Sequence, residues 1–392
     1  MKVALVHELL TMKGGAERVL RVLADMFPDA PIYTLLYDGK KLGDWFSRGR
    51  VRVSGLQNIA EKLSAVSCQL SAWPFNHHLY LSYFPKTIEA FDFSEFDLII
   101  SSSSAFAHGI ITNGKPKHLS FVHSPARYLW DRTHDVLEQA GKGILGPLKH
   151  IYLEHVFHKL RIWDSESAAR ADVILAASKE VQRRIELYWR RESTVVHPPI
   201  DDFWFRKHEA RNKEVIRQQM QHPEYFLVVS TLVPYKRIEL AIEACNKLGM
   251  HLKIVGEGPD RKRLERLNNQ QSGTNYVSFY GYRSSDELRD LYTGAKATIV
   301  PGDEDFNLVA LESMACGTPV IAFGAGGPLE TIVEGKTGEF FMDPNSESLQ
   351  EVIKKYDQKM YSIDTCKERA ATFSRAAFEN QLYSHIDELM RM

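Results

Sequence analysis

Two glutamates that lie eight residues apart, Glu304 and Glu312, mark a segment that could carry out chemistry. The loop that follows the apolar run ending at Val300 is acidic, and the pattern predicts a helix that starts near Leu308 and ends before Gly317. The start of such a helix offers unpaired amide N–H groups and a partial positive charge, which suit a phosphate. The two carboxylates could then accept hydrogen bonds from sugar or ribose hydroxyls. The alternative is that the acidic residues only solvate the loop and favour the helix start.

The elements that must position this segment alternate between short apolar runs and helical patterns, which predicts parallel sheets with helices on both faces. Strands are expected at Val3–His7, Pro31–Leu36, Asp97–Ile100, Leu119–His123, Val173–Ala177 and Thr194–His197, and, after a break, at Tyr225–Ser230, His251–Val255, Tyr276–Tyr280, Ala297–Val300, Pro319–Phe323 and Glu339–Phe341. The break is the run from His197 to Asp201, whose two prolines predict a stiff linker. We therefore expect two doubly wound α/β domains, residues 1–197 and 198–372, with ligands at the carboxyl ends of their strands, in a cleft between the two sheets.

Composition excludes several classes of protein. The 392 residues are 44% apolar and 25% charged, which argues against a disordered, collagen-like or coiled-coil chain. The net charge of −1 argues against a general nucleic-acid binder. No apolar run reaches the roughly 18–20 residues that cross a bilayer, and the start MKVALVHELL is more typical of a first strand than of a signal peptide. The four scattered cysteines predict reduced thiols of a cytosolic protein.

The segment that begins at Glu304 resembles the signature of retaining GT-B glycosyltransferases of family 4, in which a glutamate pair of this spacing precedes a run like Met-Ala-Cys-Gly-Thr-Pro-Val-Ile. Further segments agree with the family in order along nearly the whole chain: His7 with Gly14–Leu20, Phe121–Trp130, Val196–Asp201, Leu232–Arg237 and Val255–Pro259. The run Phe121–Trp130 is similar to the "HTPxRYxW" segment of mannosyltransferase-like members that build bacterial surface polysaccharides.

The resemblance implies a GT-B fold and the transfer of a hexose from a nucleotide-diphosphate sugar, with mannose from GDP-mannose as the expected donor. The anomeric configuration would be retained, and no metal or other cofactor would be required. Matching positions imply three catalytic residues: Glu304 on the donor sugar, Lys236 on the diphosphate, and His123 facing the sugar. Glu312 would hold the ribose hydroxyls. A phosphate oxygen can take the acceptor proton in the route commonly proposed for the family, so no protein nucleophile is needed. The last stretch, 373–392, is expected to form a helix that packs back on the first domain, as in GT-B relatives.

Other positions are expected at the site from the same resemblance, and each has a structural alternative such as a tight turn or a bracing contact. The donor side would include Arg237, Thr231, Gly256, Gly258, Asn307, Leu308, Gly14 and Gly15, and the acceptor side Arg127, Tyr128 and Glu17. His123 could instead be a satisfied core histidine at the end of its strand.

Three positions depart from the family pattern. Thr231 stands where the family usually has Arg, Asn307 where it usually has Gly, and Ala177 where Asn is common. A lost charge-assisted contact is worth roughly 1.5–3 kcal/mol. The departures keep a second hypothesis open, a catalytically weakened or non-catalytic scaffold subunit of the same fold. A third hypothesis is a nucleotide-sugar 2-epimerase.

The segment 148–163 combines apolar residues with Lys149, Lys159, Arg161 and several histidines. A basic amphipathic helix of this kind could rest on an anionic membrane, which would suit a lipid-linked acceptor, or it could pack on the N-terminal sheet. His155 and His158 have no recognisable third ligand, so no metal site is expected. The expected partners are a nucleotide sugar and a glycan or lipid-linked acceptor. The expected location is the cytoplasm, where the protein could also rest on the inner face of the membrane.

Overall fold

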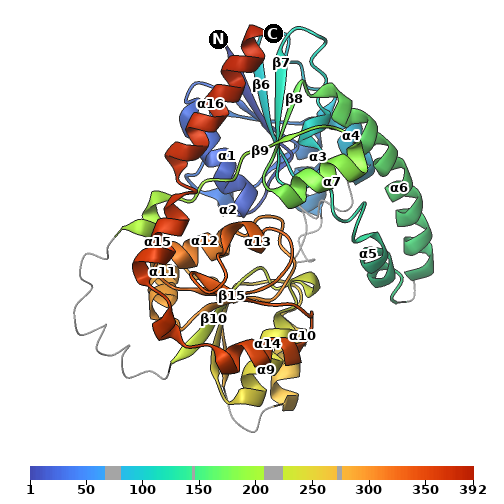
Figure 1. Cartoon of the computed structure of the whole chain (residues 1–392). Coiled ribbons are helices and arrows are strands. Elements are labelled where there is room, and N and C mark those ends of the chain that lie inside the picture. The colour runs from blue at the N-terminus through green and yellow to red at the C-terminus, as the bar shows by residue number, and fades with distance from the viewer. Residues whose placement is uncertain (67–80, 144–145, 207–223, 272–275) are drawn as a thin grey trace. The chain divides into compact units, whose positions relative to one another are not determined.

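The computed structural model describes residues 1–66, 81–143, 146–206, 224–271 and 276–392, and the chain divides into two units. The first unit is Met1–His197 with Glu379–Met392, and the second is Pro198–Phe378. Each unit contains one large parallel sheet between helices (Figure 1). The expected fold class, two doubly wound α/β domains, is therefore confirmed. The cleft between them stays a prediction.

Seven parallel strands form the sheet of the first unit, in the order β5-β3-β1-β6-β7-β8-β9. Their bounds are β1 Val3–His7, β3 Ile32–Thr34, β5 Val51–Val53, β6 Leu98–Ser103, β7 Lys117–Val122, β8 Val173–Ala176 and β9 Thr194–Val195. The chain adds strands outward from β1 in one direction and then returns to add β6 on the other side. The carboxyl ends of β1 and β6 therefore flank the point where the strand order reverses, which is the usual ligand position in such sheets.

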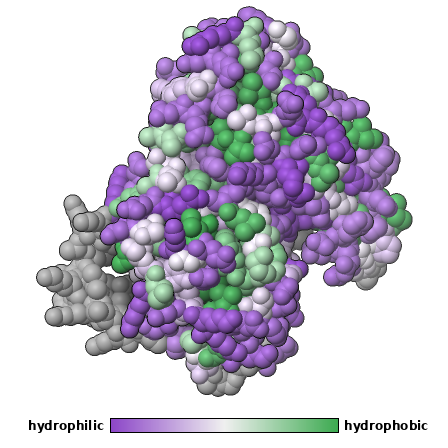
Figure 2. Space-filling model, in the orientation of Figure 1, coloured by the Kyte–Doolittle hydropathy of each residue, from purple (hydrophilic) through white to green (hydrophobic). Residues whose placement is uncertain are grey.

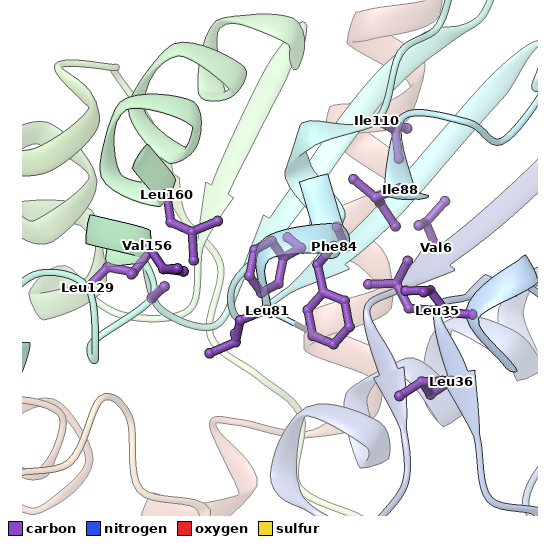
Figure 3. Close-up of a cluster of buried hydrophobic side chains, with 14 of the residues drawn as sticks. Val6, Leu35, Leu36, Leu81, Phe84, Ile88, Ile110, Leu129, Val156 and Leu160 are labelled. Atoms are coloured by element: carbon purple, nitrogen blue, oxygen red, sulfur yellow. The ribbon is translucent and has the colours of Figure 1, made fainter. Parts of the chain in front are cut away.

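The helices of this unit are α1 Gly15–Met26, α2 Gly39–Leu42, α3 Gly55–Val66, α4 Phe84–Ile88, α5 Thr133–Ala140, α6 Gly146–Ser167, α7 Lys179–Trp189 and α16 Arg375–Arg391. Helix α16 runs beside α1 (Figure 1), and the rings of Phe27 and Tyr383 meet edge to face with centroids 6.1 Å apart. One face of the sheet packs on an apolar cluster in which Val6 and Leu35 lie near Phe84 and Ile88, while Leu129, Val156 and Leu160 lie toward α6 (Figure 3).

Six parallel strands form the sheet of the second unit, in the order β12-β11-β10-β13-β14-β15. The strands are β10 Tyr225–Val229, β11 His251–Val255, β12 Val277–Gly281, β13 Thr298–Val300, β14 Val320–Phe323 and β15 Gly338–Phe341. The helices are α9 Ile238–Leu248, α10 Arg261–Gln271, α11 Ser285–Gly294, α12 Leu308–Ala315, α13 Pro328–Thr331, α14 Ser346–Lys355 and α15 Ile363–Ala371. Here the strand order reverses between β10 and β13.

Both faces of the second sheet are buried, as the continuous apolar runs predict. Along β10, Tyr225 and Leu227 belong to the core on one face, and Phe226 and Val228 to the core on the other. Each of these cores is closed by helices whose outer residues meet solvent. On the surface seen in Figure 2, hydrophilic side chains accordingly surround small apolar groups.

The expected strands agree with the observed ones to within a few residues, apart from two differences. The run Pro31–Leu36 is not one strand, because β3 ends at Thr34 and Leu36–Tyr37 (β4) pairs with Leu9–Leu10 (β2) in a separate small sheet. The edge strand Val51–Val53 was missed, since it has only three residues and they are largely exposed. A capping box opens α11: the Ser284 hydroxyl accepts from the Glu287 N–H, and the Glu287 carboxylate accepts from the Ser284 N–H. Across the described residues, no helix combines the length and apolarity that membrane spanning needs.

Candidate active site

An ion pair stands at the reversal point of the second sheet. Lys236 follows β10, Glu304 follows β13, and the Lys236 ammonium donates a hydrogen bond to Glu304 Oε2. Both side chains are 18% exposed, so neither charge is fully solvated. Burial opposes the charge on Lys236, but Glu304 outweighs it and raises the pKa of the lysine above its usual value. The ammonium therefore stays charged at neutral pH.

Close approach of two backbones brings this pair together. A Cβ atom at Gly302 would lie 2.9 Å from the Lys236 Cα and 3.0 Å from the Tyr235 carbonyl oxygen, so the loop after β13 crosses directly over the loop after β10. The loop after β14 supports Glu304 from another side, since the Gly327 N–H in that loop donates to the backbone carbonyl of Glu304 at 2.8 Å. Three strand-end loops thus fix the glutamate backbone.

The loop after β11 supports the lysine side of the site. Gly256 has φ +132°, and a Cβ atom there would lie 1.8 Å from the Ser230 carbonyl oxygen, which only glycine avoids. Gly258 lies against Leu232, whose N–H donates to the Glu257 carbonyl at 2.9 Å. These contacts hold the chain before Lys236 and give both glycines a structural purpose. Their expected contact with the donor stays a prediction.

Helix α12 begins at Leu308, four residues after Glu304, as the sequence predicts. Asn307 is the N-cap with φ +80°, and its Oδ1 accepts from the Ala310 N–H at 3.2 Å. The residue is 7% exposed, and its Nδ2 has no hydrogen-bond partner among the described residues. Leu308 opens the helix, where backbone N–H groups remain for an anion. A glycine at 307 would adopt this φ without the amide group.

Glu312 lies inside the second unit and does not take part in the ion pair between Lys236 and Glu304. Its carboxylate is buried, and Oε2 accepts from the Tyr292 hydroxyl at 2.9 Å. Tyr292 is itself fully buried on α11. The tyrosine therefore orients the glutamate that the resemblance places at the ribose, and no pattern in the sequence indicates this partner.

The two remaining residues near Lys236 differ in what they contact. Thr231 is exposed, and Arg237 has φ +51° and donates from Nη1 to the Pro344 carbonyl at 3.1 Å. The arginine side chain thus reaches toward the loop after β15. This chain has Thr231 where the family usually has arginine. No observed contact between Arg237 and Glu304 replaces that arginine.

At the reversal point of the first sheet, His7, Ser102 and His123 lie on three neighbouring strand ends. His7 and Ser102 are paired residues of β1 and β6, and His123 directly follows β7. His7 Nδ1 lies 2.8 Å from the Ser102 carbonyl oxygen, and Ser102 Oγ lies 2.8 Å from His123 Nε2. Burial, together with the charge on His7, lowers the pKa of His123 to about 3, so this ring is neutral at physiological pH.

The glycine turn after β1 is closed by Glu17. The Gly14 N–H donates to Glu17 Oε2 at 3.0 Å, and Gly15 opens α1. Glu17 Oε1 also lies 3.9 Å from His7 Nε2. Glu17, expected on the acceptor side, is buried and engaged with its own unit. Those contacts support the structural alternative for Gly14 and Glu17.

The segment after His123 is held by contacts within the first unit. Arg127 Nε donates to Asp131 Oδ2 at 3.1 Å, and the Tyr128 ring packs on Phe157 with centroids 5.6 Å apart. Burial raises the pKa of Tyr128 well above its usual value. These contacts favour bracing of the loop, and the expected acceptor role of both residues stays a prediction.

A buried carboxylate that sequence reasoning missed ties this segment to α6 and α7. Asp164 Oδ2 accepts from the indole N–H groups of Trp130 at 2.8 Å and Trp189 at 2.7 Å. Oδ1 lies 3.6 Å from His108 Nε2 and has no hydrogen bond within the described ranges. Burial raises the pKa of Asp164 to about 7, although the two indoles oppose that shift.

Neither a metal cluster nor a reactive thiol stands out in the described part of the chain. No group of three or more His, Cys, Asp or Glu there is arranged to hold a metal ion. Cys245, Cys316 and Cys366 are free thiols, and burial raises the pKa of each above its usual value. Cys68 lies outside the described residues.

Comparisons with known proteins agree with this architecture. Residues 210–372 match the family "Glycosyl transferases group 1". The structure of HepE from Anabaena in complex with UDP-glucose superposes with a TM-score of 0.72 at 17% identity, covering 99% of this chain and 100% of that one. At this identity the superposition establishes the fold, which is the GT-B fold of two parallel-sheet α/β domains.

Curated relatives match over part of their length. An uncharacterized glycosyltransferase of Methanocaldococcus jannaschii is 25% identical over 196 residues, which are 50% of this chain and 52% of the relative. Mannosylfructose-phosphate synthase of Agrobacterium fabrum is 25% identical over 248 residues, 59% of this chain and 53% of that protein. The chain thus spans about half the length of these relatives. All of the residues that match the family, 210–372, lie within the second unit.

Proposed function

We propose that this protein is a retaining glycosyltransferase that moves a hexose from a nucleotide-diphosphate sugar to a glycan or lipid-linked acceptor. The observation that carries the proposal is the Lys236–Glu304 pair at the strand reversal, just before the N-terminus of α12, inside the region that matches the family. HepE, whose structure was solved with UDP-glucose, shares the fold and supports a nucleotide sugar as donor.

The chemistry follows from where charge develops. As the bond between sugar and diphosphate breaks, negative charge accumulates on the leaving phosphate. A lysine that remains protonated, together with free N–H groups at the start of α12, would stabilise that charge more in the transition state than in the ground state. Glu304 would orient the sugar, and Glu312, held by Tyr292, the ribose. A phosphate oxygen would accept the proton of the incoming hydroxyl.

The donor sugar is proposed as mannose carried by GDP. Its support is the likeness of Phe121–Trp130 to the mannosyltransferase segment and the partial match to mannosylfructose-phosphate synthase. The test incubates the protein with GDP-mannose, UDP-glucose and other nucleotide sugars, with an oligosaccharide or lipid-linked acceptor, in the presence of Mg²⁺ or of EDTA. We expect an α-linked product from GDP-mannose that persists in EDTA. A folded protein that transfers no sugar from any donor would contradict the proposal.

The second candidate is a scaffold that has lost donor binding. Thr231 favours it, because the family usually has arginine there and, among the described residues, Arg237 instead donates to the Pro344 carbonyl. Calorimetry with GDP and UDP separates the two functions. An enzyme binds one of them, and Thr231→Arg strengthens that binding. A scaffold binds neither, whereas isomerisation of a nucleotide sugar without an acceptor would indicate the 2-epimerase.

We further propose that the first turns of α6 contact an anionic membrane. The helix packs inward through Val156, Phe157 and Leu160, which supports the packing alternative for its second half. Its first half exposes Leu148 by 69%, Ile151 by 64% and Tyr152 by 57%. Exposed Lys149 and Lys159 lie on the same helix. Apolar side chains beside basic ones are the combination that binds an anionic bilayer surface.

Vesicle sedimentation tests this contact. The protein should bind vesicles that contain phosphatidylglycerol more strongly than neutral ones, and Leu148→Ser with Ile151→Ser should weaken that binding. Tyr282→Ser, which removes a 71% exposed apolar side chain from the second unit, is the matched control. Equal binding by all variants would contradict the membrane contact.

A further inference from the structure

A chain of polar contacts joins Glu17 to His123 across the carboxyl edge of the first sheet. Glu17 Oε1 lies 3.9 Å from His7 Nε2, His7 Nδ1 lies 3.2 Å from Ser102 Oγ, and Ser102 Oγ lies 2.8 Å from His123 Nε2. His7, Ser102 and Glu17 are buried. Nothing in the proposed chemistry yet uses His7 or Ser102, although both lie at the strand reversal.

The partners of His7 determine where its protons lie. Nδ1 faces the Ser102 carbonyl oxygen at 2.8 Å, and a carbonyl can only accept, so Nδ1 carries a proton. Nε2 faces the Glu17 carboxylate. Burial opposes a charge on His7, but Glu17, Glu8 and the Ser102 carbonyl together raise its pKa. The protonated ring is therefore favoured.

The proton on His7 Nδ1 determines the direction of the hydrogen bond between the Ser102 hydroxyl and His123. Within the described residues its Oγ has two side-chain neighbours, His7 Nδ1 and His123 Nε2. Because His7 Nδ1 is a donor, the hydroxyl accepts from it and gives its own hydrogen to His123 Nε2. The reverse arrangement, with the proton on Nε2, would leave the hydroxyl hydrogen without an acceptor among these neighbours.

His123 then has one ring proton, and that proton is on Nδ1. The ring is neutral, and Nδ1 has no hydrogen-bond partner in the described part of the chain. We propose that Ser102, His7 and Glu17 are positioning residues that fix His123 as its Nδ1–H tautomer, so that this N–H donates to an oxygen of the transferred sugar. The inference rests on the proposed sugar transfer, together with the family resemblance, which implies that His123 faces that sugar. It makes His123 a hydrogen-bond donor and excludes it as a general base at neutral pH.

Nitrogen-15 NMR of the full-length protein labelled at histidine tests the tautomer without any activity. His123 signals are assigned by their loss in His123→Asn. We expect a protonated Nδ1 and a bare Nε2 that do not titrate between about pH 6 and 8. Ser102→Ala should shift His123 toward the Nε2–H tautomer that predominates for histidine in water. A proton found on Nε2 in the wild type, or no change in Ser102→Ala, would overturn the inference.

The matched control is Ser101→Ala. Ser101 is the neighbouring buried serine on β6, and its Oγ lies 2.8 Å from His118 Nε2. Ser101→Ala breaks an equivalent serine–histidine contact, so it should change the NMR signals of His118 only. Equal melting temperatures for the two variants show that neither result reflects unfolding.

Kinetics complete the test. With the donor that the wild type uses, Ser102→Ala should lower kcat/KM about tenfold, the loss of roughly one hydrogen bond, and leave the affinity for the nucleotide alone unchanged. Ser101→Ala should leave both unchanged. A wild type that transfers no sugar contradicts the proposed function, whereas equal kcat/KM for the two serine variants contradicts this inference alone.

Discussion

The strand reversals of the two sheets are built from different chemistry. In the first unit, Ser102 lies between the neutral ring of His123 and His7, whose pKa is raised by its acidic neighbours against the effect of burial. In the second unit, a lysine and a glutamate form a partly buried ion pair. The same topology therefore supports oriented hydrogen bonds in one place and fixed charge in the other. Fixed charge suits a diphosphate, and oriented donors suit hydroxyl groups.

The interior of the first unit also differs from the charged site of the second unit, because burial there favours the neutral forms of titratable groups. Burial lowers the pKa of His108 and of His118 to about 3 and raises that of Asp164 to about 7. Each of these groups is thus favoured in its neutral form. We expect substitutions of charged groups to act most strongly on catalysis through the second unit, and pH to act on stability through the first.

The largest effect is expected from Lys236→Met. Loss of the ammonium removes a charge-assisted contact to the leaving diphosphate, so kcat/KM should fall about 10²–10³-fold. Steady-state transfer rates measure it. Lys247→Met is the control, because it breaks a second Lys–Glu pair of the same unit, 3.4 Å from Glu347 on the surface. Equal transfer rates for the two variants would show that Lys236 does not stabilise the leaving diphosphate. That result would contradict the contrast drawn between the two units.

An intermediate effect is expected on the stability of Asp164→Asn. The unfolded chain loses this proton near pH 4, whereas the folded protein keeps it up to about pH 7. The folded state binds more protons in that window, so its free energy of unfolding falls as the pH rises through it. An amide oxygen can still accept from both indoles but does not ionise. From pH 5 to 8 the variant should gain on the order of 2–3 kcal/mol relative to wild type.

Urea unfolding at both pH values measures this difference. A gap between wild type and Asp164→Asn that stays constant from pH 5 to 8 would show that the carboxyl is ionised in the folded protein. Asp164 would then add a buried charge to the interior of the first unit.

The smallest effect is expected at Asn307, where two substitutions should act in opposite directions. Asn307→Asp keeps a cap acceptor but places a negative charge near the bound diphosphate, so nucleotide affinity should fall about tenfold while the melting temperature is maintained. Asn307→Gly removes the side chain at φ +80° and restores the usual family residue, so affinity should rise a few-fold. Calorimetry with GDP and UDP measures both changes.

Asn345→Asp controls for the cap itself. Asn345 caps α14, and its Oδ1 accepts from the Ser348 N–H at 2.8 Å in an exposed position. This variant should leave nucleotide affinity unchanged. A fall in affinity on Asn307→Gly would instead show that the Asn307 amide helps to bind the ligand.

The fold was largely predictable from the sequence, because buried parallel strands are continuous apolar runs separated by helical patterns. Runs such as Val3–His7 and His251–Val255 coincide with β1 and β11. The edge strand β5 was not predicted, since three largely exposed residues are too short a run to indicate a strand. The helix start at Leu308 was predicted from the residue pattern, whereas the roles of Lys236 and Glu304 came from the family resemblance, whose motifs lie on short loops directly after strands.

The sequence by itself determined the fold class, the strand ends and the residue types available at them. Only the tertiary structure decided which of these side chains share protons or charge. Ser102 and His123 are 21 residues apart, and Trp130 and Asp164 are 34 apart. Their contacts depend on strand order and helix packing, which join residues distant in sequence at hydrogen-bond distance. Residue spacing along the chain does not encode that geometry, so the proton positions at the first sheet edge emerged only from the folded molecule.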